Sequence, residues 1–264
     1  MTDDEAPVEI AALAQEAACA RLRTLAAASG AAVRHGEGWF AVRTGVDSND
    51  MNGVVSEAGA PITRRLVDEL TSWFAGTPAS WLTLRPNVRL TEVLLASGAR
   101  PERTGRWSGR RMPFPLPAAT SGVTVSVVDS LDGLDMWLDV AAECGWTHTE
   151  DDRRARRSLY ASLLGNDQPL THWLALDATQ PVGFASSYQL GQVVDLCNLA
   201  VLPSRRREGI GRALISARLA FAATQGATAI VSAPSPEGWA IQRTLGFESA
   251  PVTPDTTFYL PTST

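Results

Sequence analysis

The segment 199–214 constrains the fold more than any other part of the chain; it reads Leu-Ala-Val-Leu-Pro-Ser-Arg-Arg-Arg-Glu-Gly-Ile-Gly-Arg-Ala-Leu. An apolar strand runs into Pro203, an arginine-rich turn follows, and Gly209 and Gly211 open an amphipathic helix that we expect to continue to about Gln225. Glycines let backbone N–H groups approach a ligand, and the unpaired N–H groups at a helix start attract an anion. The segment therefore predicts a strand-turn-helix that binds an anion.

Two familiar phosphate sites do not fit this turn. A dinucleotide site requires Gly-x-Gly-x-x-Gly, and a P-loop requires a lysine. All 23 residues in the Lys and Arg count are arginine, so the sequence contains no lysine. Mechanisms that depend on a lysine Schiff base or a lysine nucleophile are thereby excluded.

Charge and cysteine content narrow the function classes further. A net charge of −5 argues against general nucleic-acid binding, which requires a basic surface. Cys19, Cys144 and Cys197 are far apart in the sequence, so we expect neither a disulfide framework nor a metal site. We find no apolar run of the roughly 20 residues that a membrane span needs. These features favour a cytoplasmic protein without membrane association.

A proline-rich segment divides the sequence. Three prolines alternate with other residues from Pro113 onward, which favours an extended connector. We expect a first domain over residues 1–116, a linker over 117–122 and a second domain over 123–264. The first domain shows a fainter copy of the order strand, strand, helix, strand, helix, strand of the second. Strands and helices alternate in both, which predicts a mixed α/β fold.

The glycine-rich turn resembles the signature of the GNAT superfamily of acyl-CoA-dependent N-acyltransferases. That signature is Gln or Arg, two variable residues, Gly, one variable residue, and Gly or Ala, which Arg206, Gly209 and Gly211 satisfy. Pro203 before the turn and Leu-Gly-Phe at 245–247 are further matches. The resemblance implies two tandem GNAT-like domains, each a mostly antiparallel sheet flanked by helices, of which the first is degenerate.

The resemblance also implies an acetyl-CoA site in the second domain. Amides of the turn would wrap the CoA pyrophosphate, the preceding strand would pair with the pantetheine arm, and an amide near Leu199 would polarise the thioester carbonyl. Residues 233–242 would flank the acyl and sulfur end. The expected CoA-binding residues are Leu199, Ala200, Val201, Arg206, Arg207, Glu208, Gly209, Ile210, Gly211, Arg212, Ala233, Ser235 and Trp239.

Asp195 is the candidate general base. An amine with a pKa near 10.4 is only about one part in 10³ neutral at pH 7, so a base aids its attack. Several GNAT enzymes place a carboxylate on the strand before the turn, as Asp195 is placed here. Strand alternation predicts that Asp195, Cys197 and Leu199 share one face. The alternatives are deprotonation through water and an edge carboxylate bonded to a neighbouring loop.

Gln242 departs from the family pattern. Many members have a tyrosine at this position, three residues before Leu-Gly-Phe, and it protonates the departing thiolate. Gln242 can donate a hydrogen bond to the sulfur but cannot give up a proton. Its presence slows a transferase without forbidding it, and Ser235 or water could replace the tyrosine.

The acceptor site is expected at the loop that contains Trp146, His148 and Glu150. His148 is an alternative base or a solvated loop residue. We therefore expect an N-acyltransferase that moves acetyl from acetyl-CoA to the amine of a small molecule by direct attack. The alternatives are a non-catalytic CoA-binding protein and transfer of a larger acyl group from CoA or an acyl-carrier protein. A carrier would dock on the arginines Arg153, Arg154, Arg156 and Arg157.

Overall fold

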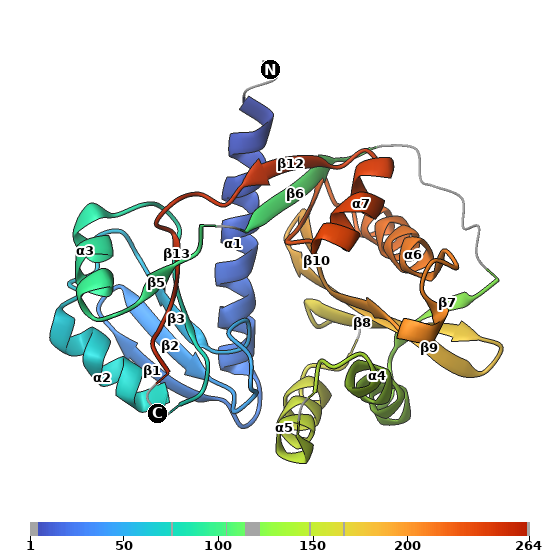
Figure 1. The fold of residues 1–264 in the computed structure, drawn as a ribbon, viewed down its shortest axis with the longest axis horizontal. Helices are drawn as coiled ribbons and strands as arrows, with labels where there is room; N and C mark the ends of the chain where they lie inside the picture. The colour runs from blue at the N-terminus through green and yellow to red at the C-terminus, as the bar shows by residue number, and fades with distance from the viewer. Residues whose placement is uncertain are drawn as a thin grey trace. The chain divides into compact units, whose positions relative to one another are not determined.

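The computed structural model describes residues 5–74, 76–103, 105–113, 122–147, 149–165 and 167–262. They form two compact units (Figure 1). The large unit comprises Met1–Ala17 and Arg106–Ala250, and the small unit comprises Ala18–Gly105 and Pro251–Thr264. Along the chain the large unit is therefore interrupted by most of the small one.

The helices and strands have the following bounds. Up to the middle of the chain they are α1 (Glu5–Ala27), β1 (Ala32–Gly36), β2 (Trp39–Arg43), β3 (Gly53–Ser56), α2 (Arg64–Phe74), β4 (Ser80–Thr83), α3 (Val88–Ala96), β5 (Arg100–Pro101) and β6 (Arg106–Arg111). They continue with β7 (Thr124–Val128), α4 (Leu131–Glu143), α5 (Glu150–Ala161), β8 (Leu170–Asp177), β9 (Gln180–Leu190), β10 (Val193–Val201), the short 3₁₀ helix η1 (Pro203–Arg205), α6 (Ile210–Thr224), β11 (Ala229–Ser232), α7 (Pro236–Thr244), β12 (Glu248–Pro251) and β13 (Thr257–Tyr259).

A seven-stranded sheet organises the large unit, in the order β12-β6-β11-β10-β9-β8-β7. β10 and β11 run parallel, whereas β10–β9, β9–β8, β8–β7 and β11–β6 are antiparallel. Helix α6 covers one face, where Leu219 packs with Leu196 of β10. Helix α4 covers the other face, where Trp137 lies against Phe184 of β9 (Figure 1). The sheet thus forms the middle layer of three.

The small unit has its own sheet, in the order β1-β2-β3-β4-β13-β5. β3 and β4 run parallel and are paired along their full length, from Gly53–Ser80 to Ser56–Thr83. Its core surrounds Trp81 and Phe258, both fully buried, with helices α2 and α3 on the same cluster. The strands β1 to β4, followed by β13 and β5, repeat the order and pairing of β8 to β11, followed by β6 and β12.

The repeat includes an exchange of strands. β6 ends the first copy in sequence but pairs with β11 of the large unit, Ser108 opposite Ser232. β13 ends the second copy but pairs with β4 of the small unit, Phe258 opposite Trp81. The mixed α/β class is confirmed, and the described residues form two sheets that share a strand order. The expected domain limits at 116 and 123 differ from the limits of the two units, because strand pairing joins segments that are distant in sequence. Most of the expected linker, residues 117–121, lies outside the described residues.

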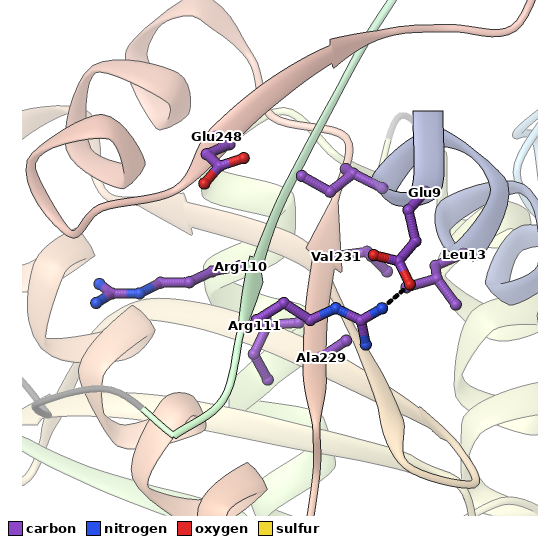
Figure 2. A pocket seen from close by; sticks show the side chains of 9 residues that line it. Glu9, Leu13, Arg110, Arg111, Ala229, Val231 and Glu248 are labelled. Carbon is purple, nitrogen blue, oxygen red and sulfur yellow. Dashed lines mark ion pairs between the residues drawn. The ribbon is translucent and has the colours of Figure 1, made fainter. Parts of the chain in front are cut away.

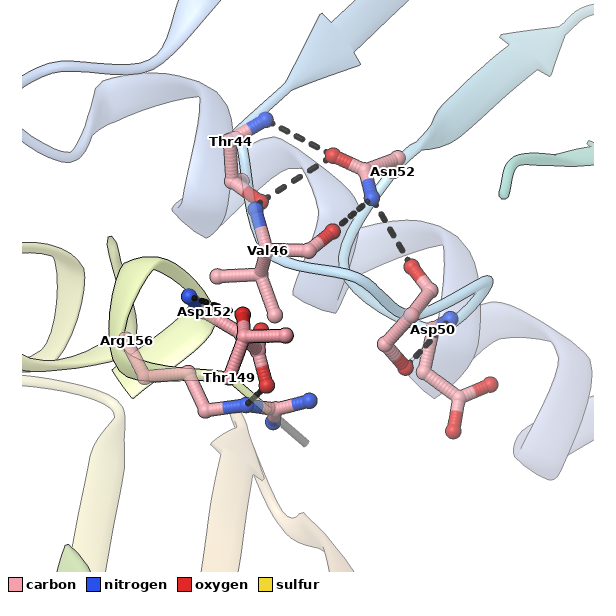
Figure 3. A network of polar contacts seen from close by, with 8 residues as sticks. Thr44, Val46, Asp50, Asn52, Thr149, Asp152 and Arg156 are labelled. Carbon is pink, nitrogen blue, oxygen red and sulfur yellow. Dashed lines mark hydrogen bonds and ion pairs between the residues drawn. The ribbon is translucent and has the colours of Figure 1, made fainter. Parts of the chain in front are cut away.

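Two polar networks stabilise local structure, one in a loop of the small unit and one within helix α5 of the large unit (Figure 3). In the small unit Asn52 is fully buried; its Nδ2 donates to the carbonyl of Val46 at 2.7 Å, and its Oδ1 accepts from the Thr44 amide at 2.8 Å. In the large unit Arg156 and Asp152 form an ion pair at 3.1 Å, and both side chains are buried. Within the described residues, no helix is long and apolar enough to cross a membrane.

Candidate functional site

The turn between β10 and α6 presents backbone N–H groups. Arg207 and Gly209 adopt positive φ angles of 67° and 82°. Gly209 is the N-cap of α6, and no side chain caps the helix there. The first N–H groups of α6 have no intrahelical acceptor, so together with the turn they form a concave set of donors. Such donors attract anions, and the anion site at this turn stays a prediction.

The arginines of the turn divide into two groups. Arg205 is held internally, since its Nη2 lies 2.8 Å from Asp177 and 2.9 Å from Glu208. Arg206 and Arg207 are exposed, and among the described residues neither forms an ion pair. Arg212 donates to the Thr244 hydroxyl at 3.0 Å. Within the described part of the chain, the charges of Arg206, Arg207 and Arg212 are therefore not paired with a carboxylate, whereas Arg205 stabilises the turn.

The sheet opens beside this turn. Register pairs between β10 and β11 run from Val193–Ala229 to Asp195–Val231, although β10 continues to Val201. The Leu202 amide donates to Val182 of β9 at 3.0 Å, so strand alternation directs the amides of Val201 and Leu199 to the opposite edge. That edge faces the opening. An extended ligand can pair there with β10 as an added strand.

Gly211 lets the walls of this opening converge. A Cβ atom at residue 211 would lie 3.3 Å from Ile241 of α7 and 3.9 Å from Leu199 of β10. A larger side chain would push these elements apart. The second glycine of the motif therefore serves close packing, and the first serves the backbone conformation of the turn.

A β-bulge changes the alternation expected for β10. The register with β9 shifts between Cys197–Ser186 and Ala200–Phe184, and Asn198 has a φ of 48°. Leu199 consequently packs with Leu196 on the α6 face. The prediction that Leu199 shares a face with Asp195 is wrong, because the extra residue of the bulge reverses the phase.

Asp195 lies at the last register pair before the opening. It is 6% exposed, and its register partner Val231 packs against Ala14 and Ala17 of α1. In the pairing of β10 with β9, Asp195 lies opposite Tyr188, which is also buried. A carboxylate here is desolvated, and access from the opening determines whether it can act as a base.

Gln242 is buried and engaged on both ends of its amide. Nε2 donates to the Ser232 hydroxyl at 3.0 Å, and Oε1 accepts from the Ser108 hydroxyl at 2.6 Å. The side chain is 4% exposed and joins α7 to β6 and β11. These two hydrogen bonds would have to break before both N–H groups of Nε2 could donate to a thiolate. Ser108 lies 134 residues away in sequence, so no local signal pointed to it.

The start of α7 lines the other side of the opening. Ser235 is the N-cap, and its hydroxyl accepts from the Gly238 amide at 3.1 Å. The pKa of Glu237 is lowered by its own backbone N–H, by the Ser235 hydroxyl and by the charge of Arg206. Trp239 is half-buried, with the Arg106 guanidinium 5.7 Å from its ring centroid. Ala233, between β11 and α7, is exposed.

The expected acceptor residues are only partly described. Trp146 is half-buried and packs edge-on against Phe184, with 5.4 Å between ring centroids. Glu150 is exposed at the first position of α5. His148 lies outside the described residues, so the structure places two of the three.

The basic face of α5 is neutralised by carboxylates. Two of its arginines pair with α4: Arg157 with Asp135 at 2.6 Å and Arg153 with Asp139 at 2.8 Å. The Arg157 side chain holds the pKa of Asp135 below its usual value. Arg154 pairs with Asp151 at 2.9 Å. The α5 arginines thus do not form an unbalanced basic patch for an acidic carrier protein.

A separate pocket lies beside α1, β6 and β11 (Figure 2). Glu9 and Arg111 form an ion pair at its wall, and Leu13 and Val231 line it. It belongs to the packing of α1 on the sheet and does not include the glycine-rich turn.

Comparison with known proteins agrees with this geometry. Residues 133–247 match the Acetyltransferase (GNAT) family. A GCN5-related N-acetyltransferase from Kribbella flavida has a similar fold, with 19% identity, a TM-score of 0.64, and coverage of 94% of this chain and 96% of that chain. A functionally unknown conserved protein from Staphylococcus epidermidis is similar at 12% identity, with a TM-score of 0.51 and coverage of 87% and 92%. No curated protein sequence matches the chain. The large unit thus contains the segment that matches the GNAT family, and the chain as a whole shares its fold with a GCN5-related N-acetyltransferase.

Proposed function

We propose that the large unit is an acyl-CoA-dependent N-acyltransferase that moves acetyl from acetyl-CoA to the amine of a small molecule. The observation that carries the proposal is the uncapped turn at Gly209 next to the opening between β10 and β11. The turn offers amides and two exposed arginines for a pyrophosphate, and the edge of β10 offers amides for a pantetheine arm. Both parts of CoA fit the residues present.

The proposed reaction is direct attack in a ternary complex. The amine nitrogen forms a bond to the thioester carbonyl carbon, the carbon–sulfur bond breaks, and the thiolate takes up a proton. The Leu199 amide donates to the carbonyl oxygen as negative charge develops there, a contribution typically worth about 2.7–4 kcal/mol. Asp195, or water in contact with it, accepts the proton that the amine loses.

A matched pair of variants tests the CoA turn. Gly209 and Gly226 bracket α6, both are exposed, and their φ angles are 82° and 71°. Gly209→Glu places a carboxylate roughly 6 Å from the bound pyrophosphate, which opposes binding by about 3 kcal/mol at an effective dielectric constant of about 20. We expect the Kd for CoA, measured by calorimetry, to rise at least ~30-fold after salt screening. Gly226→Glu adds the same charge and similar strain at the other end and should leave the Kd within about twofold.

The second candidate is a CoA-binding protein without turnover. It is favoured by Gln242, which replaces a proton donor and is held by Ser108 and Ser232. Release of free CoA thiol from acetyl-CoA with a panel of small amines distinguishes the two. Amine-dependent release above the hydrolysis rate supports the transferase, whereas tight CoA binding without release supports the binding protein.

A further inference from the structure

One arginine of α6 is buried in the core. Arg218 is 1% exposed, and burial lowers its pKa to about 10 although nearby Cys197 and Asp195 oppose this change. It occupies a position between Ile215 and Leu219, both buried, on the face that packs against the sheet. An arginine in the apolar phase of a helix is a sequence signal for a specific role, because burying a guanidinium is unfavourable without hydrogen bonds.

The Arg218 guanidinium bonds to backbone carbonyls around the bulge. Nη1 donates to Ser186 of β9 at 2.8 Å and to Cys197 of β10 at 3.2 Å. Nε donates to Leu214 of its own helix at 3.1 Å. Ser186 and Cys197 are the last register pair before the shift. The side chain thus joins the two strands where their ladder is interrupted.

A second buried donor reaches the same place from the opposite face. The Trp137 indole of α4 donates to the carbonyl of Ala185 at 3.0 Å. Ala185 is the single β9 residue opposite two residues of β10, Asn198 and Leu199. In the bulged register, the carbonyls of Ala185, Ser186 and Cys197 therefore accept hydrogen bonds from side chains. These bonds favour the bulged pairing of β10 with β9.

We propose that Arg218 is a positioning residue that holds the β10 bulge and thereby aims the Leu199 amide at the thioester carbonyl. This rests on the proposed acetyl transfer. Without the guanidinium, the Ser186 and Cys197 carbonyls each lose one hydrogen bond, and a slip of β10 against β9 becomes more favourable. The slip would turn the amide of residue 199 away from the opening, while the phosphate turn at the start of α6 stays intact.

The test uses Arg218→Met, which keeps side-chain length and removes the donors. We expect its crystal structure to show a shifted register between Cys197 and Ala200. We expect kcat to fall about 10²-fold, with the Kd for CoA within about threefold of wild type. With ¹³C-labelled acetyl-CoA bound, the infrared carbonyl stretch should move from the lowered wild-type frequency toward that of free acetyl-CoA.

Three further variants keep the test decisive. Leu219→Ala removes a buried side chain of the same helix that makes no bond to the bulge, so it should lower the Tm and leave kcat and the carbonyl frequency unchanged. Trp137→Phe keeps an aromatic ring but removes the indole donor and part of the buried ring, and it should change the frequency in the same direction as Arg218→Met. Arg218→Leu, which also removes every donor but has a shorter side chain, replaces Arg218→Met if the latter fails to fold.

The outcomes separate this inference from the proposed function. An Arg218→Met or Arg218→Leu protein that keeps the bulge, the wild-type frequency and kcat overturns the role of Arg218. If the wild-type protein binds acetyl-CoA but neither lowers the carbonyl frequency nor releases CoA with amines, the transferase proposal is overturned. The role of the Leu199 amide as a donor to the thioester carbonyl is then overturned as well.

Discussion

Phe258 offers the sharpest test of the strand exchange. Its side chain is fully buried in the small unit and stands opposite Trp81 of β4 and Pro101 of β5. Phe258→Ala should cost about 3–5 kcal/mol, the range for a phenylalanine deleted from a packed core. A domain typically has only about 5–15 kcal/mol of net stability, so the loss is a large fraction of the total. The damage should appear in residues 18–105, although Phe258 follows the acetyltransferase domain in sequence.

Hydrogen exchange read by mass spectrometry locates the damage. In Phe258→Ala, peptides from β2, β3 and β4 should lose about 3–5 kcal/mol of opening free energy, while peptides from β8 and β9 keep theirs. Phe247→Ala is the control, because Phe247 is buried in the large unit's cluster with Leu219 and should show the opposite pattern. Loss of protection in β8 and β9 on Phe258→Ala, with β2 to β4 unaffected, would refute the pairing of β13 with β4.

Three further predictions concern individual side chains. Arg207→Ala should weaken CoA binding, because the exposed Arg207 charge is available to phosphate. Arg205→Ala should mainly lower the Tm, because the Arg205 charge is paired with Asp177. Equal effects of the two variants on the Kd for CoA would contradict these different roles. Asp195→Asn should lower kcat about 10²-fold with an unchanged Kd for CoA, and an unchanged kcat would exclude it as the base. Burial lowers the pKa of His172 to about 3 in the folded protein, against 6.5 in the unfolded chain. Its contribution to stability is therefore present above pH 6.5 and is lost as the pH falls toward 3, at about 1.4 kcal/mol per pH unit. The difference in unfolding free energy between wild type and His172→Gln, plotted against pH, should show this slope, and a constant difference would contradict it.

Local patterns predicted much of the secondary structure. The helix expected from Gly209 to about Gln225 is observed at Ile210–Thr224, because hydrophobic periodicity and glycine boundaries are local properties. The strand Ala32–Gly36 was not predicted, since it reads Ala-Val-Arg-His-Gly and is largely exposed. Sheet partners depend on distant parts of the chain, so the exchange of β6 and β13 had no local signal.

The site shows the same limit. The turn at Gly209 could be predicted because glycine positions constrain the backbone directly. The partners of Gln242 and Arg205 could not, because Ser108 and Asp177 reach them through tertiary folding. The bulge at Asn198 also has no marker in an otherwise regular strand pattern, and it reversed the predicted face of Leu199.

The exchange of β6 and β13 has a consequence for how such a chain evolves. After a gene duplication, a copy that has lost its ligand turn is ordinarily free to be deleted. Here the first copy supplies Arg106–Arg111 to the sheet that holds the acetyltransferase domain, including Ser108 beneath Gln242. Selection acting on the second copy alone therefore preserves the coding sequence of the first. A duplicate without a glycine-rich turn thus becomes a permanent part of the copy that has one.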